Sequence, residues 1–575
     1  MDAFIDARIN EWLLGDYDTE TKNEIQRMLR ENPEELNDAF YKSLEFGTGG
    51  LRGIMGVGTN RMNKYTVGAA TQGLANYLKQ QFPSGELKVA IAYDSRNNSG
   101  FFAQTAADIL SANGIRTYLF EELRATPELS FAVRYLECNA GIVITASHNP
   151  KEYNGYKVYW NDGGQLVPPH DINVIKEVLK IDTLDKVKWE KQPGLIEMIG
   201  EKVDEAYIEQ VRSLSLNPDI ITKQKNLNIV YTPLHGTGIT MVPRALHAFG
   251  FEKVSVVDEQ AVPDGNFPTA PYPNPEERST LMMALQKADA IGADLVMATD
   301  PDADRVGIAV RNEQGEMVLL NGNEMASLLT WYILSEKKKK GLLHENDFIV
   351  KTIVTTDLMR DIADSFHTPC YNVLTGFKYI AEKIREFEGK SSFICGGEES
   401  YGFLIGDFVR DKDAISTCCL VAELAAFMAE KGQTLTRLLE NLYLDYAYYK
   451  ETQVSVTKKG KAGAEEIKAI MDQYRRNPPE TIGTGKVTGI IDYQSGKNHD
   501  CISGNTKETG LPVSNVLQFV TGDGTLVTVR PSGTEPKIKF YISVQHKITK
   551  REDLMKTERL LNDRIESITE SLNLK

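Results

Sequence analysis

One pattern recurs along the chain and limits the folds it can adopt. A short apolar run, with the length of a buried strand, ends abruptly in small and polar residues. The pattern occurs before Thr145–Pro150, before Thr299–Arg305 and before Gly396–Gly402, with helical periodicity in between. Strands that alternate with helices predict parallel α/β sheets. The three occurrences of this pattern predict three related α/β domains. The prediction rests on the pattern alone, because no literal sequence repeat is visible.

The two ends of the chain differ from this pattern. Residues 1–45 have apolar side chains at helical spacing and a helix-start signal at Asn32-Pro33. We expect them to be helices packed on the first α/β domain. In the last hundred or so residues, strand-like runs such as Ile538–Val544 mix with helical stretches. A smaller α+β domain is expected there.

Charge and cysteine content exclude several classes of protein. Lys and Arg number 65 against 80 Asp and Glu, a net charge of −15, so a broad nucleic-acid-binding surface is not expected. The six cysteines form no C-x-x-C pair, which argues against a disulfide framework or a zinc site. There is no signal-peptide pattern, and no apolar run approaches about 18 residues. We therefore expect a cytoplasmic protein with no nucleic-acid or membrane partner.

Ser147 stands directly after the first of the three strands, in Thr145-Ala146-Ser147-His148-Asn149-Pro150. Open α/β sheets bind ligands at the carboxyl ends of their strands. A serine next to a histidine, closed off by Asn-Pro, is typical of an activated hydroxyl and equally of an ordinary turn. Lys157 follows ten residues later, and a turn at Asn154-Gly155 would fold it back beside Ser147.

Three aspartates follow the next strand at alternate positions, Asp300, Asp302 and Asp304. Like charges so close together are costly unless a cation neutralises them, and carboxylates suit Mg²⁺ or Ca²⁺. An EF-hand loop is excluded, because Arg305 stands where it needs glycine and Arg311 where it needs glutamate. The alternative, a solvated acidic loop, fits poorly next to a wholly apolar strand.

Two further segments suit a phosphorylated, hydroxyl-rich ligand. Arg530–Lys537 combines a guanidinium, hydroxyls, a glycine and a lysine, the ingredients of a phosphate-binding nest, although it is not a Walker A loop. Arg52 lies in the glycine-rich segment Phe46–Gly53 and could reach a phosphate, unless that segment is only a flexible hairpin. Glu398 and Ser400 suit sugar hydroxyls, although such residues also cap helices.

These pieces together fit phosphoryl transfer, which needs little beyond alignment and charge neutralisation. A Ser-His-Asp hydrolase is the competing class. Ser147 lacks the G-x-S-x-G elbow of the α/β-hydrolases, and a catalytic triad would leave the three aspartates and the phosphate nest without a role.

Four motifs, at Thr145–Pro150, Asp300–Arg305, Gly397–Gly402 and Arg530–Thr534, resemble those of the α-D-phosphohexomutase superfamily, in its order and at roughly its spacing. Phe46–Gly53 and Tyr153–Lys157 are similar as well, so the resemblance covers nearly the whole chain after about residue 45. It implies an α/β fold of three related doubly wound α/β domains plus a smaller C-terminal α+β domain around a central cleft. The expected parts are a helical extension (1–45), domain 1 (46–205), domain 2 (206–320), domain 3 (321–445) and domain 4 (446–575).

The resemblance also implies roles for the motif residues. The catalytic residues would be the phosphoserine Ser147, the acid/base candidates His148 and Lys157, and Arg52 and Arg305 beside the transferring phosphoryl group. One Mg²⁺ per active site would be held by Ser147, Asp300, Asp302 and Asp304. Sugar hydroxyls would bind to Glu398 and Ser400, and the phosphate that is not transferred to Arg530, Ser532, Gly533 and Thr534, with Lys378 as a helper.

The implied reaction interconverts glucose 1-phosphate and glucose 6-phosphate by two phosphoryl transfers, with glucose 1,6-bisphosphate as intermediate and activator. The loop Gly397–Gly402 resembles the glucose type, whereas dual mannose/glucose members more often show Gly-Glu-x-Ser-Gly-His. Residues 1–45 exceed the minimal pattern and resemble a long branch that includes pentose phosphate and bisphosphate synthase activities. Activity on pentose or mannose phosphates therefore stays open, and so does the oligomeric state. A non-catalytic sugar-phosphate sensor is a third possibility, although a sensor needs no nucleophile.

Overall fold

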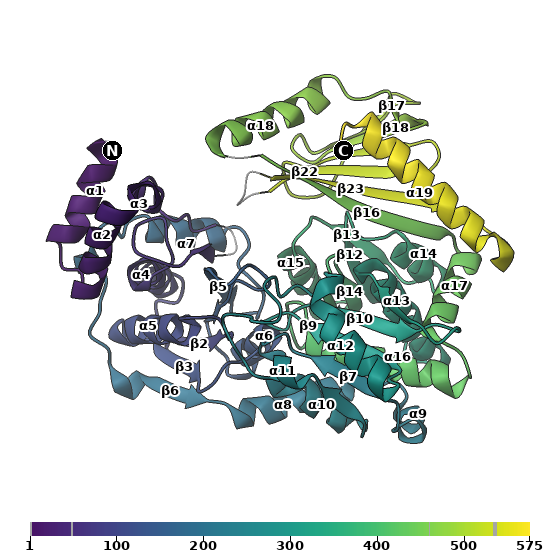
Figure 1. Cartoon of the computed structure of the whole chain (residues 1–575), viewed down its shortest axis with the longest axis horizontal. Helices are drawn as coiled ribbons and strands as arrows, with labels where there is room; N and C mark the ends of the chain where they lie inside the picture. The colour runs from purple at the N-terminus through teal and green to yellow at the C-terminus, as the bar shows by residue number, and fades with distance from the viewer. Residues whose placement is uncertain (1–2, 48–49, 459, 533–536, 575) are drawn as a thin grey trace.

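The computed structural model describes residues 3–47, 50–458, 460–532 and 537–574. Four sheets follow one another along the chain (Figure 1). The largest hydrophobic cluster includes one face of the first sheet and continues through the second and third α/β domains. The predicted fold class, three α/β domains followed by a C-terminal domain, is confirmed. The domain bounds given above stay predictions.

The N-terminal segment is helical, as its periodicity predicts. Asn32 caps α3 by accepting a hydrogen bond from the amide of Glu35, and Pro33 stands in the first turn. Trp12 and Phe40 pack in a cluster that reaches Tyr65 on the first helix of domain 1. The helices are α1 (Ala3–Leu14), α2 (Thr19–Glu31) and α3 (Pro33–Phe40).

Domain 1 contains a sheet with the strand order β1-β5-β4-β2-β3-β6. Along β2, Val89 and Ile91 point to the face covered by α4 and α5, while Ala90 and Ala92 point to the face covered by α6. Its elements are β1 (Gly50–Ile54), α4 (Lys64–Gln81), β2 (Lys88–Tyr93), α5 (Ser99–Ala112), β3 (Arg116–Phe120), α6 (Thr126–Tyr135), β4 (Ala140–Ile144), β5 (Tyr153–Trp160), α7 (His170–Val178), η1 (Leu184–Lys186), η2 (Pro193–Leu195) and β6 (Ile196–Ile199).

Domains 2 and 3 contain smaller sheets, ordered β11-β10-β9-β7-β8 and β13-β12-β14-β15. α8 (Glu201–Ser213) crosses the predicted boundary between domains 1 and 2. Domain 2 then comprises α9 (Pro218–Lys223), β7 (Ile229–Thr232), α10 (Gly238–Phe249), β8 (Val254–Val256), α11 (Asp258–Ala261), α12 (Arg278–Ile291), β9 (Leu295–Thr299), β10 (Val306–Arg311) and β11 (Met317–Leu320). Domain 3 comprises α13 (Gly322–Lys339), β12 (Asp347–Thr352), α14 (Leu358–Ser365), β13 (Cys370–Val373), α15 (Phe377–Phe387), β14 (Ser392–Gly397), β15 (Phe403–Ile405), α16 (Ala414–Glu430) and α17 (Leu435–Asp445).

The three sheets are mixed, whereas the sequence pattern predicted parallel ones. In each, a parallel strand continues into an antiparallel neighbour: β4 into β5, β9 into β10 and β14 into β15. The polar segments predicted at strand ends are therefore hairpin connections. The difference arises because a short polar run can close a hairpin as readily as it can lead into a helix.

Domain 4 is a sheet with two long helices, and all pairings among its described strands are antiparallel (Figure 1). Its strand order is β16-β23-β22-β21-β18-β19-β20, with β17 beside β18. The elements are β16 (Tyr448–Thr457), α18 (Gly460–Arg476), β17 (Thr481–Ile482), β18 (Gly485–Asp492), β19 (Lys497–Asp500), β20 (Thr506–Glu508), β21 (Leu517–Thr521), β22 (Leu526–Pro531), β23 (Lys537–His546), η3 (Arg551–Asp553) and α19 (Leu554–Ser571). Across the described ranges of the chain, none of the helices has the length and apolar character needed to cross a membrane.

The contact between domains 3 and 4 supports a prediction about pH. Glu451 on β16 accepts a hydrogen bond from Ser543 and lies close to Glu324 on α13. Burial, with the charge of Glu324, raises the pKa of Glu451 from 4.5 to about 7. Between these two values the folded protein binds more protons than the unfolded chain, so stability is lost as the pH rises through this window.

We therefore expect Glu451→Gln to be more stable than the wild type at pH 8, by roughly 1–3 kcal/mol, and to differ little at pH 4.5. Urea denaturation at the two pH values measures the difference. Glu480→Gln, which changes an exposed carboxylate of the same domain, is the matched control. Equal stability of Glu451→Gln and wild type at pH 8 would contradict the expectation.

Candidate active site

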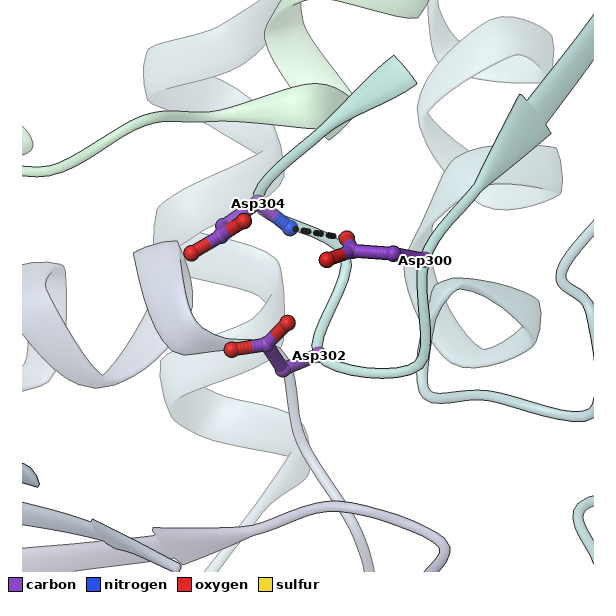
Figure 2. A group of neighbouring side chains, drawn as sticks. All are labelled: Asp300, Asp302 and Asp304. Carbon is purple, nitrogen blue, oxygen red and sulfur yellow. Dashed lines mark hydrogen bonds between the residues drawn. The ribbon is translucent and has the colours of Figure 1, made fainter. Parts of the chain in front are cut away.

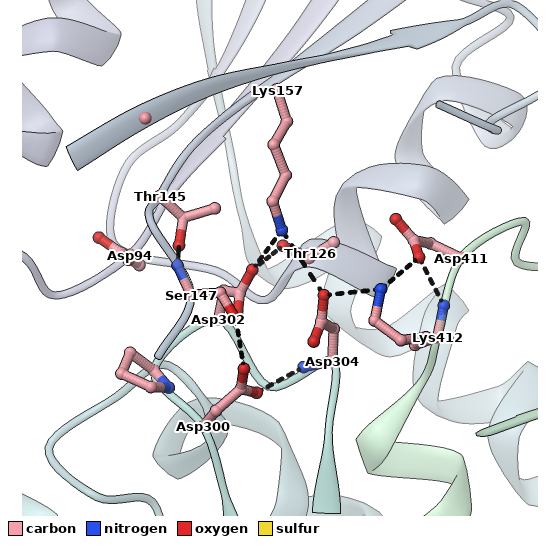
Figure 3. Close-up of polar contacts among 12 residues, drawn as sticks. Asp94, Thr126, Thr145, Ser147, Lys157, Asp300, Asp302, Asp304, Asp411 and Lys412 are labelled. Atoms are coloured by element: carbon pink, nitrogen blue, oxygen red, sulfur yellow. Dashed lines mark hydrogen bonds and ion pairs between the residues drawn. The ribbon is translucent and has the colours of Figure 1, made fainter. Parts of the chain in front are cut away.

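Ser147 lies on the connection between β4 and β5, at the carboxyl end of the parallel strands (Figure 3). Its backbone is left-handed, with φ at 52°, which is uncommon for a residue other than glycine. The Ser147 amide donates a hydrogen bond to the Thr145 hydroxyl at 2.8 Å. The Ser147 Oγ donates to Asp300 Oδ2 at 2.7 Å and lies 3.2 Å from His148 Nδ1. The predicted nucleophile thus faces the aspartate loop of domain 2.

Arg96 holds the serine loop in place, a role that sequence reasoning missed. It follows β2, is 3% exposed, and donates to the carbonyl oxygens of four loop residues between Ser147 and Tyr153. The Asp94 carboxylate lies 3.4 Å from the Arg96 Nε. The signal that could have identified it is its place at a strand end beside an aspartate.

The three predicted metal-binding aspartates lie together between β9 and β10 (Figure 2). Asp300, Asp302 and Asp304 are 0%, 0% and 2% exposed, and one ligand oxygen of each lies within 4.8 Å of the others. Asp300 Oδ1 accepts hydrogen bonds from the amides of Asp304 and Arg305, both at 3.1 Å. In contrast, Oδ1 of Asp302 and Oδ1 of Asp304 are buried without a hydrogen-bond partner. Buried polar atoms normally have partners, so these two oxygens are suited to a cation.

Two lysines stabilise the other oxygens of the aspartate group (Figure 3). Lys157 Nζ lies 2.7 Å from Asp302 Oδ2 and 3.5 Å from Asp304 Oδ2. Lys412 Nζ lies 3.1 Å from Asp304 Oδ2 and 3.0 Å from Asp411 Oδ1. Lys412 was not singled out in the sequence, although it follows β15 between two aspartates.

The turn expected at Asn154-Gly155 is wrong, because both residues belong to β5. The chain reverses earlier, after Pro150, and β5 then runs antiparallel to β4 with Lys157 opposite Val143. Lys157 therefore reaches the site from the middle of a strand. Its nearest partner is Asp302, across the domain boundary.

The aspartates differ in their electrostatic environment. Burial and the charges of Asp302 and Asp304 raise the pKa of Asp300 well above its usual value. Burial opposes ionisation of Asp302 as well, but the ammonium of Lys157 outweighs it and lowers the pKa of Asp302. A divalent cation at the two oxygens that accept no hydrogen bond would remove the repulsion that acts on Asp300. The donor set of hard, buried carboxylates therefore fits a metal ion.

His148 is held neutral beside two arginines. Burial, together with the charges of Arg305 and Arg52, lowers the pKa of His148 well below its usual value. Arg305 Nη1 donates to His148 Nδ1 at 2.9 Å, so the ring proton is on Nε2. Because Ser147 donates to Asp300, and His148 Nδ1 is already an acceptor for Arg305, a serine–histidine hydrolase pair is not formed.

A cleft of about 670 Å³ joins these groups, and residues of all four domains line it. Cationic side chains from all four domains line it. Arg52 comes from β1, where its Nη1 lies 3.4 Å from Asn149 Oδ1, and Arg305 from the aspartate loop. Domain 4 contributes three more cations, and domain 3 the hydroxyl-binding candidates. The cationic and candidate hydroxyl-binding residues that line the cleft are Arg52, Lys157, Arg305, Glu398, Ser400, Lys412, Arg530, Lys537 and Lys539.

The remaining predicted residues fall in different places. Lys378 is not among the residues lining the cleft, and its Nζ lies 3.9 Å from Asp171 of domain 1. Ser532 follows Arg530 after β22, and its amide donates to the Lys537 carbonyl at 2.7 Å. Gly533 and Thr534 lie outside the described residues. Their roles stay predictions.

The site defines a class of protein. A serine hydroxyl lies against buried carboxylates that fit a hard cation, and cationic side chains from all four domains line the adjoining cleft, as suits a phosphorylated ligand. This arrangement is that of a phosphoryl-transfer enzyme.

Comparison with known proteins supports the assignment to phosphoryl-transfer enzymes. The models of the phosphoglucomutase/phosphomannomutase alpha/beta/alpha domains I, II and III match residues 43–185, 205–315 and 321–446, and the C-terminal domain model matches 451–551. The chain therefore belongs to the phosphoglucomutase/phosphomannomutase family, within the α-D-phosphohexomutase superfamily. It is an enzyme, an intramolecular phosphotransferase, as the sequence resemblance predicted.

Relatives and solved structures extend this finding. The chain is 38% identical to a phosphoglucomutase of Staphylococcus haemolyticus over 509 residues, which cover 88% of this chain and 91% of the relative. It is 38% identical to that of Staphylococcus aureus strain USA300 over 518 residues, covering 89% and 91%. A putative phosphomannomutase from Thermus thermophilus shares the fold, with a TM-score of 0.68, 20% identity and coverage of 92% and 98%. Parafusin, a phosphoglucomutase from Paramecium, shares it with a TM-score of 0.67, 15% identity and coverage of 92% and 96%.

Proposed function

We propose that this enzyme interconverts glucose 1-phosphate and glucose 6-phosphate, with Ser147 as the phosphate carrier and glucose 1,6-bisphosphate as intermediate and activator. The observation that carries the proposal is the Ser147 Oγ bonded to Asp300, in a buried group of three carboxylates, where Ser147 and Asp304 line a cleft that also carries cationic side chains. The glucose assignment rests on the relatives named phosphoglucomutase and on the Gly397–Gly402 sequence.

We propose one Mg²⁺ per active site, held by Ser147, Asp300, Asp302 and Asp304. The Oδ1 atoms of Asp302 and Asp304, which are buried and accept no hydrogen bond, support this assignment, since hard carboxylate oxygens suit Mg²⁺. When bound, the ion would neutralise charge on the transferring phosphoryl group.

In the first transfer, the bond between phosphorus and the Ser147 Oγ breaks as phosphorus bonds to a sugar hydroxyl oxygen. The hydroxyl proton must leave as that bond forms. His148 and Lys157 are the proposed acid/base groups. His148 could accept a proton at Nδ1 once the hydrogen bond from Arg305 is released, and Lys157, held as an ammonium by two carboxylates, is able to donate one. Arg305 and Arg52 would steady the phosphoryl oxygens in transit.

The other end of the substrate would bind to domains 3 and 4. Arg530, Ser532, Gly533 and Thr534 are proposed to hold the phosphate that is not transferred. Glu398 and Ser400 are proposed to bind sugar hydroxyls, and Glu398 Oε1 is fixed by the Gly376 amide at 3.0 Å. Lys378, which points toward Asp171, is the weakest of these assignments.

The intermediate would then turn over in the cleft, so that its other phosphate faces Ser147 and returns to it. The same residues serve both transfers, because the two phosphates exchange places. We also propose a cytoplasmic location, which the six cysteines support, since none of them forms a disulfide in the described part of the chain.

Two measurements test the proposal. Intact-mass analysis after incubation with Mg²⁺ and glucose 1,6-bisphosphate is expected to show one added phosphate, located at Ser147 by peptide mapping. The values of kcat/KM for glucose 1-phosphate, mannose 1-phosphate and ribose 1-phosphate are expected to rank glucose first. A phosphate on another residue would overturn the mechanism, and a higher value for the mannose or pentose substrate would overturn the specificity. Phosphate binding without turnover would identify a sensor.

A further inference from the structure

We infer that Thr126, the first residue of α6 in domain 1, is a positioning residue for Asp302 in domain 2. Its hydroxyl and amide fix Asp302 so that one carboxylate oxygen is left free for the metal ion. The inference rests on the proposed metal site, and it concerns a residue outside all of the sequence motifs described above.

The two oxygens of Asp302 have different surroundings. Asp302 Oδ2 accepts hydrogen bonds from Lys157 Nζ at 2.7 Å and from Thr126 Oγ1 at 3.0 Å, whereas Oδ1 is buried with no partner (Figure 3). Thr126 and Asp302 are both 0% exposed, so no solvent competes for these contacts. Two donors on one oxygen determine the rotation of the carboxylate, and the other oxygen is thereby directed to the aspartate group.

The backbone makes a second contact between the same two residues. The Thr126 amide donates to the Asp302 carbonyl at 2.9 Å. The helix cap Ala125 has no side-chain hydrogen bond to offer, and Pro127 has no amide proton. The Asp302 carbonyl therefore takes up a free amide of the first turn of α6, and the peptide and carboxylate of Asp302 are held by one residue.

The start of α6 is itself anchored through Asp204 on α8, which an arginine of domain 2 contacts as well. Arg124, just before the helix, donates from Nε and Nη2 to the two carboxylate oxygens of Asp204 on α8, at 3.0 and 2.9 Å. Arg244 on α10 donates to the same carboxylate at 3.2 Å. A bidentate arginine–carboxylate pair fixes direction as well as distance. The helix start that carries Thr126 is thus held in place by these arginine–carboxylate contacts.

Lys157 alone would orient Asp302 less well. Its ammonium is shared between Asp302 and Asp304, and it sits on a flexible four-carbon chain. Lys157 is also a proposed acid/base group, and its contacts would change during turnover. The β-branched side chain of Thr126 has few rotamers and is not among the residues lining the cleft, so it holds Asp302 throughout.

The test is the affinity of the full-length protein for Mn²⁺, measured by calorimetry and by the electron paramagnetic resonance of free Mn²⁺. Thr126→Val keeps the shape of the side chain and removes the hydroxyl. Partners behind metal ligands typically contribute 10–100-fold in affinity, so we expect Thr126→Val to raise the Kd for Mn²⁺ by about that factor. Thr126→Ser, which keeps the hydroxyl, is expected to stay close to the wild type.

Thr330→Val is the matched control. Thr330 is also 0% exposed, and its hydroxyl donates to the Ala326 carbonyl within α13. It should show a comparable loss of stability with no change in Mn²⁺ affinity. If Thr126→Val does not fold, Thr126→Ala is measured instead. An unchanged Kd in the hydroxyl-free variant, or a raised Kd in Thr126→Ser equal to that of Thr126→Val, would overturn the inference. Failure of the wild type to bind any divalent cation would instead overturn the proposed metal site.

Discussion

Ser147→Ala is expected to reduce the interconversion of glucose 1-phosphate and glucose 6-phosphate by about 10⁴-fold or more, because alanine offers no oxygen to carry the phosphate. The fold should persist. The Ser147 amide keeps its bond to Thr145, and Arg96 holds the loop through backbone carbonyls, which the substitution leaves in place. Binding of the sugar phosphate should persist too, since its proposed anchors lie in domains 3 and 4.

Three measurements on the same sample check this result: turnover in a coupled assay, the mass of the intact protein, and the Kd for glucose 6-phosphate. We expect no turnover above background, no added phosphate, and a Kd near that of the wild type. Ser503→Ala, which changes an exposed serine between β19 and β20, is the control for the substitution itself. Residual turnover within a factor of ten of wild type would mean that Ser147 is not the carrier.

The parts of the site that sequence could predict are those encoded by a short contiguous motif. Ser147 and the three aspartates each follow an apolar strand, and the edge of a sheet is where such segments meet. That logic places Ser147 and Asp300 together although 153 positions separate them, and their side chains are indeed hydrogen-bonded. The helical N-terminus could also be predicted, because capping and periodicity are local signals.

The parts that could not be predicted depend on tertiary contacts, within and between domains. Lys412 and Thr126 acquire their roles only when the aspartate loop is placed against them, and neither stands in a segment with a distinctive pattern. Arg96 acts on backbone carbonyls, and its place at a strand end beside an aspartate does not indicate which carbonyls it contacts. The hairpin partners β5, β10 and β15 were missed for a similar reason, since strand direction is decided by pairing and periodicity cannot reveal it.

Asp300→Asn is the second substitution expected to have a large effect, and it separates charge from shape. The asparagine carbonyl can keep the hydrogen bonds that Asp300 Oδ1 accepts from the amides of Asp304 and Arg305. Its amide group would then replace Oδ2, the atom that accepts the Ser147 proton. A donor at that place repels both the cation and the serine proton, so we expect metal affinity to fall by at least about 100-fold and kcat by about 10³-fold.

Titration with Mg²⁺ and Mn²⁺ measures the affinity, and steady-state kinetics at saturating metal measures kcat. Asp289→Asn, at an exposed carboxylate that pairs with Arg311, is the control and should leave both unchanged. Removal of metal from the wild type with EDTA should reproduce the kinetic loss, and added Mg²⁺ should restore the wild type but not Asp300→Asn. If Asp300→Asn bound metal normally and still lost activity, Asp300 would act on the serine proton alone, and the metal would be held by Asp302 and Asp304. Asp300 Oδ2, which accepts the hydrogen bond from Ser147, would then serve the serine proton and not the metal.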